Sequence, residues 1–244
     1  MFDNELKKIN DLQKEINSLR PLDDEEVNQL KEYYRIGLTY SSNALEGNSL
    51  TESETKVIIE DGLTIGGKSI KEHLEVLGHS EAFSFIHDIA SGELLTEKDL
   101  LKIHSLVYGR VDKDQAGVYR DKRIFLSGSK YSFPKPDEVQ QLMSEFFYRL
   151  STLKKELHPV ILAVQAHKEF VFIHPFVDGN GRVGRLLMNL LLIQAGHLIT
   201  IIPPVLRSEY IASLEKAHTD DSDFIRFILR CHVEAQKEYL RLVK

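Results

Sequence analysis

The sequence predicts an all-α protein, a helical bundle with one small β-hairpin flap. Long stretches of the chain have apolar residues at three- to four-residue spacing, and prolines and glycines separate these stretches. Only residues 117–134 have the composition of strands joined by a turn. Because no internal repeat or low-complexity linker divides the chain, we expect one compact unit, with N-terminal helices over residues 1–48 and the main body and C-terminal helices over residues 49–244.

In the first half of the chain, apolar spacing and breaker residues predict five helices. Pro21 ends the first helix, and Asp23 with Glu26 is typical of the capped start of the second. Gly47 is placed to end this second helix, and Thr96 is the expected N-cap of the fifth. The predicted ranges are 3–20, 23–47, 48–59 and 70–89, followed by a helix that begins at residue 96.

The second half begins with the strand-like segment. Residues 117–120 and 124–126 have strand-like composition, residues 127–130 offer a turn, and residues 131–133 can return as a second strand. Pro134 and Pro136 close this hairpin. A hairpin in a helical protein has either of two roles: it covers a surface, or its exposed edge docks an extended segment of a partner.

Helices are predicted again after the hairpin. Asp137 can cap a helix that runs to residue 153, and a helix that starts at His158 and Pro159 leads to residue 173. Residues 186–193 are apolar nearly all round, so their helix should lie at the centre of the bundle. The last segment, residues 207–244, predicts two helices joined near residues 219–223.

Composition excludes several classes of protein. The net charge of −6 and the pI near 5.9 argue against a binder of nucleic acid or of anionic membranes, because those partners favour basic surfaces. The single cysteine, Cys231, excludes an internal disulfide and a multi-cysteine metal cluster. The apolar runs are too short to span a bilayer, and the first twenty residues carry charges throughout. We therefore expect a cytoplasmic protein.

The most informative stretch is residues 174–185, which combine a titratable base, a carboxylate, a glycine-rich turn and two arginines. Pro175 disfavours the helical conformation at His174, so the preceding helix should end there and leave the imidazole at the mouth of a site. An imidazole with an unperturbed pKa near ~6.5 can accept a proton from an attacking hydroxyl. Asp178 is a hard oxygen ligand of the kind that Mg²⁺ takes beside substrate phosphates.

The remainder of this stretch has the features of an anion site. Gly179 and Gly181 flank Asn180 and allow positive φ and a close approach of the backbone, and a helix start follows them. Arg182 and Arg185 are three residues apart, so both lie on one face of the first helical turn and can bind phosphate oxygens. Each feature alone is common in turns, loops or solvated faces. Together they predict a site for a polyphosphate.

The stretch matches the signature H-x-F-x-[D/E]-G-N-G-R-x-x-R at every defined position, and the chain therefore resembles the Fic family. The resemblance implies a Fic-fold helical bundle and a Mg²⁺-dependent protein adenylyltransferase, which transfers AMP from ATP to a hydroxyl of a target protein. It also implies the role of each residue: His174 as the base, Asp178 as the Mg²⁺ ligand, Gly179, Asn180 and Gly181 as the anion hole, Arg182 at the inner phosphates and Arg185 at the γ-phosphate.

A second motif spans residues 42–47. Ser42 and Glu46 are four residues apart and share one helical face near a helix end, where a surface glutamate is ordinary. Beside the signature, this motif resembles the inhibitory motif [S/T]-x-x-x-E-[G/N] of Fic proteins whose inhibitory helix is N-terminal, the class II proteins. The resemblance implies that Glu46 pairs with Arg185 and displaces the γ-phosphate of ATP, which makes the protein autoinhibited.

The resemblance also assigns roles outside these two motifs. In Fic proteins a flap aligns the target side chain and covers the nucleotide, so the target is expected to dock along residues 117–134. The residues expected nearest ATP are Ile124, Phe125, Leu126 and Ser127, largely through their backbones. Tyr210 and His218 are expected at the adenine pocket, although many relatives have asparagine where His218 stands and both residues can equally be ordinary helix-surface residues.

Several alternatives stay open at this point. The first is hydrolytic removal of AMP from a modified protein, with Glu46 orienting a water and His174 protonating the leaving hydroxyl. A second is a non-catalytic nucleotide-gated binding protein or oligomer switch. A third is transfer of the γ-phosphate, which the resemblance disfavours because the kinase branch of the family departs from G-N-G-R in this turn. A fourth is a metal hydrolase using His167, for which no zinc spacing is present. The target protein, self-modification and homo-oligomer formation are not determined by the sequence.

Overall fold

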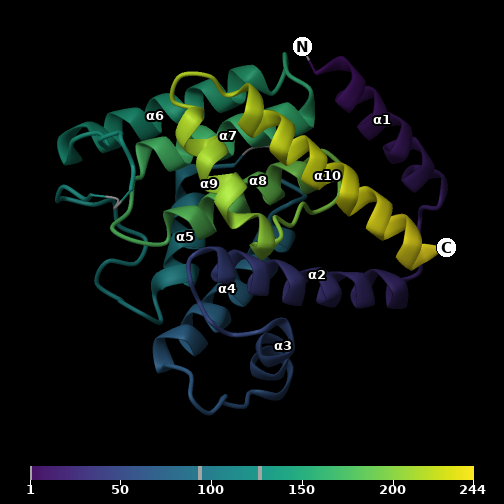
Figure 1. Cartoon of the computed structure of the whole chain (residues 1–244), viewed down its shortest axis with the longest axis horizontal. Helices are drawn as coiled ribbons and strands as arrows, with labels where there is room; N and C mark the ends of the chain where they lie inside the picture. The colour runs from purple at the N-terminus through teal and green to yellow at the C-terminus, as the bar shows by residue number, and fades with distance from the viewer. Residues whose placement is uncertain (1, 93–94, 126–127) are drawn as a thin grey trace.

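The computed structural model describes residues 2–92, 95–125 and 128–244, and it confirms the helical fold class (Figure 1). In the described part of the chain the elements are α1 (Asp3–Ser18), α2 (Asp24–Leu45), α3 (Glu52–Asp61), α4 (Ile70–Asp88), α5 (Glu97–Tyr108), α6 (Pro136–Leu153), α7 (Pro159–Ile173), α8 (Asn180–Gln194), the short 3-10 helix η1 (Pro204–Leu206), α9 (Arg207–Lys216) and α10 (Ser222–Val243).

Helix α8 lies at the centre of the bundle, as its apolar sequence predicts. Its side chains Leu186, Leu187 and Leu190 are fully buried, and α7, α5, α4 and α2 all pack against it (Figure 1). The approach of α7 to α8 is close, because a Cβ atom added at Gly184 would lie 2.8 Å from the Nδ1 atom of His167. The loop and first turn that carry the signature are therefore anchored on the most buried helix of the protein.

The N-terminal helices pack on different parts of the bundle. Helix α1 lies along α10, the last helix of the chain, whereas α2 contacts α3, α4 and α8 (Figure 1). The predicted start of α2 is confirmed: the Asp23 side chain accepts from the backbone N–H of Glu26, and the Glu26 carboxylate accepts from that of Asp23. The far end of α2 stops at Leu45, and Glu46 follows as its C-cap. The division of the chain at residue 48 stays a prediction.

The predicted β-hairpin is wrong for the residues that the structure describes: residues 117–125 and 128–134 contain no strand. The reason is that their backbone groups bond to other partners. The backbone N–H of Arg120 donates to the carbonyl of Pro175, and its buried guanidinium donates to the carbonyls of His174, Lys122 and Pro134. One arginine thus ties the flap to the signature loop, where the prediction had placed a ladder between strands.

Other sequence predictions differ from the structure at helix starts. Helix α8 begins at Asn180, so Asn180 and Gly181 lie within its first turn, where the sequence had placed them in a turn before the helix. Helix α3 begins at Glu52 with Thr51 as its N-cap, later than the predicted residue 48. Helix α6 begins at Pro136, so Asp137 lies in its first turn and does not cap it. None of the helices in the described ranges is long and apolar enough to cross a membrane.

Candidate functional site

His174 is the C-cap of α7 and has a left-handed backbone, with φ 51° and ψ 59°. In the described chain it is the only residue other than glycine with positive φ. Its Nδ1 atom lies 3.1 Å from the carbonyl oxygen of Val171, so Nδ1 carries the proton and Nε2 keeps its lone pair. Burial lowers the pKa of His174 to about 4. The imidazole is therefore neutral at physiological pH and able to accept a proton at Nε2.

The loop after His174 is held in place by two side chains. Asn180 bonds the backbone of Phe176 on both sides, accepting from its N–H at 3.0 Å and donating to its carbonyl at 2.9 Å. His104, fully buried in α5, donates from Nε2 to the carbonyl of Asp178 at 3.1 Å and accepts the backbone N–H of Gly117 at 2.8 Å. The Phe176 ring stacks on His104 at 3.6 Å between centroids. No local spacing in the sequence indicates these contacts of His104.

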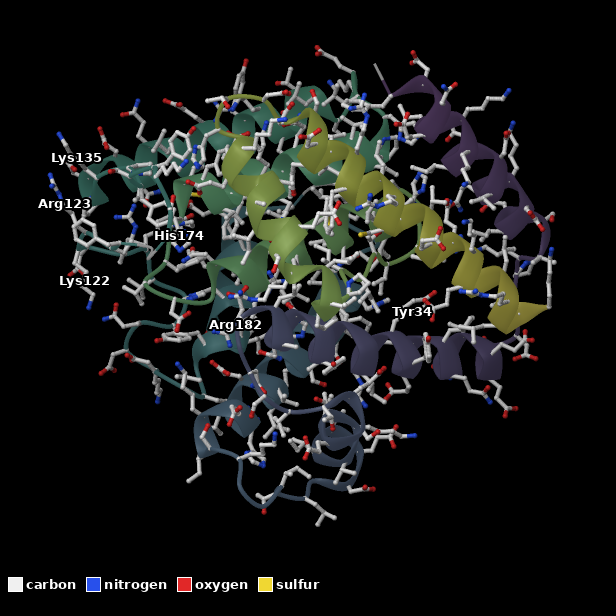
Figure 2. All side chains as sticks on the ribbon, viewed as in Figure 1. Tyr34, Lys122, Arg123, Lys135, His174 and Arg182 are labelled. Carbon is white, nitrogen blue, oxygen red and sulfur yellow. The ribbon has the colours of Figure 1, made fainter. Side chains whose placement is uncertain are left out.

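Arg182 and Arg185 lie in the first turn and a half of α8, and each is only 2% exposed. Figure 2 shows Arg182 beside the end of α2. Two of their N–H donors, Nε of Arg182 and Nη1 of Arg185, are buried without a hydrogen-bond partner among the described residues. A buried donor without an acceptor is costly, so such donors indicate a place for a ligand. The N-terminus of α8 adds unpaired backbone N–H groups and a positive dipole end. The chemistry of this donor set fits phosphate oxygens.

Glu46 fills part of this anion site. Its Oε1 atom accepts from Nη2 of Arg185 at 2.7 Å, and Arg185 also donates to the hydroxyl of Ser42 at 3.0 Å and to its carbonyl at 2.8 Å. A Cβ atom added at Gly181 would lie 2.2 Å from Oε1 of Glu46, so the carboxylate rests directly on the first turn of α8. Burial raises the pKa of Glu46, but the charge and hydrogen bond of Arg185 together with the charges of Arg182 and Arg207 outweigh burial, and the net shift is downward. The predicted contact between Glu46 and Arg185 is confirmed.

Glu75, on α4, is a second acid at this site that sequence analysis missed. Its Oε1 atom lies 3.1 Å from Nη1 of Arg182, and its Oε2 atom accepts from the Asn48 side chain at 3.1 Å. Only 12% of the Glu75 side chain is exposed. Arg185 thus pairs with Glu46, whereas Arg182 pairs with Glu75 and, at 3.5 Å, with Asp178. The signal that could have indicated Glu75 is its place on an inward face of α4, which many structural residues share.

Asp178 differs from these acids because 45% of its side chain is exposed. Its Oδ1 atom accepts from the backbone N–H of Gly179 at 2.6 Å, and its Oδ2 atom lies 3.9 Å from Nζ of Lys71. Within residues 2–92, 95–125 and 128–244, His, Cys, Asp and Glu side chains form no group of three that could hold a metal by themselves. A single accessible carboxylate beside a phosphate site fits Mg²⁺, which keeps several waters and shares phosphate ligands.

The flap meets the site through aromatic contacts. The Phe133 ring stacks on the His174 ring with centroids 4.0 Å apart. Of the residues predicted nearest ATP, Ile124 is partly buried and Phe125 is 89% exposed, whereas Leu126 and Ser127 lie outside the described residues. The flap therefore lies over the base, while the predicted contacts of residues 124–127 with ATP stay predictions.

Tyr210 and His218, the predicted adenine contacts, have different surroundings. Tyr210 is buried, and its hydroxyl lies 2.9 Å from Nε2 of His167, which accounts for that histidine without a metal. His218 is partly exposed and lies between two rings, with Tyr131 at 3.9 Å and Phe172 at 3.7 Å between centroids. His218 thus belongs to an aromatic stack with the flap. The contact of both residues with adenine stays a prediction.

Comparison with known proteins gives concordant matches. The model of the Fic/DOC family matches residues 94–192. A protein of Nematostella vectensis named "Protein adenylyltransferase Fic" is 40% identical over 205 residues, which are 82% of this chain and 48% of the relative. The chain thus spans about half the length of the curated relatives it matches.

Solved structures of Fic proteins have the same fold. Fic-1 from C. elegans, residues 134–508, is 31% identical with a TM-score of 0.89, covering 98% of this chain and 72% of that one. A Fic domain containing signaling protein from Bacteroides thetaiotaomicron is 27% identical, also with a TM-score of 0.89, and the match covers 97% of both chains.

Proposed function

The chain belongs to the Fic/DOC family, and we propose that it is a protein adenylyltransferase that transfers AMP from ATP to a hydroxyl of a target protein. The observation that carries the proposal is a neutral base beside an unsatisfied anion site: His174 keeps a free lone pair at Nε2, and buried donors of Arg182 and Arg185 lack acceptors among the described residues. The name of the Nematostella relative supports the same activity.

The proposed reaction uses these groups directly. The target oxygen forms a bond to the α-phosphorus of ATP, and its proton passes to Nε2 of His174. The bond from the α-phosphorus to the oxygen that bridges to the β-phosphate breaks, and pyrophosphate leaves. Arg182 and Arg185 neutralise charge on the leaving phosphates, and the backbone of residues 179–181 approaches the phosphate oxygens closely. The protein contributes position and charge, with no covalent enzyme intermediate.

Asp178 is the residue that would hold Mg²⁺ in this proposal. Its partly exposed carboxylate lies beside the phosphate site and is not enclosed by other ligands in the described chain. A bound Mg²⁺ neutralises phosphate charge.

We also propose that Glu46 inhibits the enzyme. Its carboxylate takes the Arg185 donor Nη2 and rests over Gly181, where a phosphate would otherwise have access. Typical coupling energies of about 1–3 kcal/mol correspond to a change of roughly 5- to 150-fold in competent ATP binding. The protein is thus self-inhibited until Glu46 moves.

One observation favours a second candidate function, the removal of AMP from a modified protein. The Glu46 carboxylate is ionised and its side chain is 42% exposed, so it can hold a water molecule while it still contacts Arg185. In this reaction the water attacks the phosphorus of the AMP group, and the departing target oxygen takes up a proton from His174. Removal of Glu46 distinguishes the two functions, because it should raise transfer and abolish hydrolysis.

Label transfer tests both functions. ATP labelled at the α- or the γ-phosphate is incubated with Mg²⁺, target lysate and three proteins: wild type, Glu46→Gly, and Glu46→Gly combined with His174→Ala. We expect covalent α-label with Glu46→Gly, little with wild type, and none when His174 is also replaced. Label from the γ-phosphate alone would instead show a kinase. Loss of a pre-formed α-label only in the presence of wild-type protein would establish AMP removal.

A further inference from the structure

A groove opens beside the flap on the side of α6, along the segment where the target is expected to dock, and its chemistry indicates which targets it accepts. It has a volume of about 640 Å³. Its apolar lining includes Phe125, which is 89% exposed, and Phe133, whose ring also stacks on His174. Phe133 therefore forms part of the groove wall and at the same time contacts the ring of the base.

The rim of this groove is basic, although the protein as a whole has a net charge of −6. Arg123 and Lys135 line the groove, and Lys122 is next to Arg123 in the chain (Figure 2). None of these three side chains forms an ion pair with a carboxylate in the part of the chain that the structure describes. One acid, Glu138, also lines the groove, but its carboxylate accepts the backbone N–H of Lys135 at the start of α6. The rim thus presents unpaired cations to a ligand.

The walls of the groove are fixed to the signature loop by one residue. The guanidinium of Arg120 is 2% exposed and donates to the carbonyls of Lys122, Pro134 and His174. Lys122 precedes Arg123 and Phe125 in the chain, and Pro134 lies between Phe133 and Lys135. Arg120 therefore holds both segments that line the groove. The position of the groove relative to His174 is therefore set by buried hydrogen bonds.

We propose that this groove, lined by Arg123, Phe125, Phe133 and Lys135, selects target segments in which acidic residues flank an apolar side chain close to the modified hydroxyl. The apolar side chain packs on the phenylalanines, and the acidic residues pair with the cations of the rim. Charge complementarity gives specificity to an otherwise general apolar contact. The inference deepens the proposed function, because it rests on an acceptor hydroxyl at His174.

Peptide binding tests the groove without requiring catalysis. Three fluorescent peptides of equal length each carry a central serine. In the first peptide aspartates and a leucine flank the serine, in the second lysines and a leucine flank it, and in the third aspartates flank it without an apolar residue. Anisotropy is measured on Glu46→Gly and on the same protein with Arg123→Glu and Lys135→Glu. The matched control carries Lys7→Glu and Lys8→Glu on α1, which reverse the same amount of charge on a helix that packs along α10.

We expect the aspartate and leucine peptide to bind best, and reversal of the groove charges to weaken its binding by about two- to thirtyfold, as for two partly exposed ion pairs. The control pair should leave its affinity unchanged, and the preference should shrink as salt is raised. Equal binding of all three peptides, or equal loss in the control, would overturn the proposal. AMP transfer to the same peptides is assayed in parallel. Transfer without a charge preference would refute the proposed selectivity of the groove. Charge-selective binding without transfer would support this selectivity and refute the proposed reaction.

Discussion

Replacing Glu46 separates two ways in which this residue can oppose ATP, through its charge and through the space it fills. Glutamine keeps nearly the same volume and removes the charge, whereas glycine removes both. The carboxylate accepts one bond of 2.7 Å from Arg185, and it lies over Gly181, where an added Cβ would be 2.2 Å from it. We therefore expect ATP affinity to rise from wild type to Glu46→Gln and again to Glu46→Gly.

The size of the effect follows from the exposure of the pair. A hydrogen bond to a charged group contributes about 1.5–3 kcal/mol. Because 42% of the Glu46 side chain is exposed, solvent screens part of this energy, and about 1–2 kcal/mol remains. Loss of that competition should tighten ATP binding by roughly 5- to 30-fold in Glu46→Gly. The free energy of unfolding without ATP should fall by a similar amount, because Arg185 is left buried without its anion.

Calorimetric titration with ATP and Mg²⁺ measures these affinities, with His174→Ala in every protein to prevent turnover. Glu32→Gln is the matched control, because Glu32 is on the same helix and pairs with Arg35 outside the site. Equal ATP affinity in wild type, Glu46→Gln and Glu46→Gly would refute the competition. The pKa of Glu46 is lowered from 4.5, so the stability that its charge provides is complete above pH 4.5 and is lost as pH falls below it.

Three further predictions concern neighbouring residues. His174 should stay neutral from pH 8 to 5.5, because burial lowers its pKa to about 4, and an NMR titration of its ring with a midpoint near 6.5 would contradict this. Arg120→Met should reduce the free energy of unfolding by about 2–3 kcal/mol in chemical denaturation, since buried carbonyls lose a charged donor, and a change below ~0.5 kcal/mol would count against that role. Glu75→Gln should lower the melting temperature. Pyrophosphate should then raise the melting temperature of the variant more than that of wild type, because a phosphate replaces the lost charge beside Arg182. An equal rise in both proteins would argue against this.

Sequence patterns predicted the parts of this fold that depend on local chemistry. The N-caps at Asp23 and Thr96 are both present, and each belongs to a capping box whose partner lies three residues later. The apolar run 186–193 lies at the centre of the bundle, because a helix without a polar face has to be covered on all sides. The signature predicted the site for a related reason: its functional groups follow one another along a single loop and helix start.

The flap could not be predicted in the same way. Residues 117–134 have strand-like composition. Such a composition indicates that the side chains favour packing on neighbouring segments, but it does not identify which segments these are. The decisive contacts come from Arg120, whose acceptors include His174, 54 residues away. His104 and Glu75 were missed for the same reason, because their partners Asp178 and Arg182 are distant in the chain. Side chains that link distant segments have no local period to mark them.

The architecture of the site connects the proposed inhibition with the stability of the protein. A phosphate site needs buried guanidinium groups and a helix N-terminus, and these groups are costly to bury without an anion. The C-terminal end of α2 brings Glu46 to Arg185, and α4 brings Glu75 to Arg182, so internal carboxylates stabilise the resting site. Glu46 is the more exposed of the two, with 42% of its side chain accessible against 12% for Glu75. In the proposed function it is therefore the acid that a γ-phosphate displaces at lower cost, while the less exposed Glu75 stays paired with Arg182.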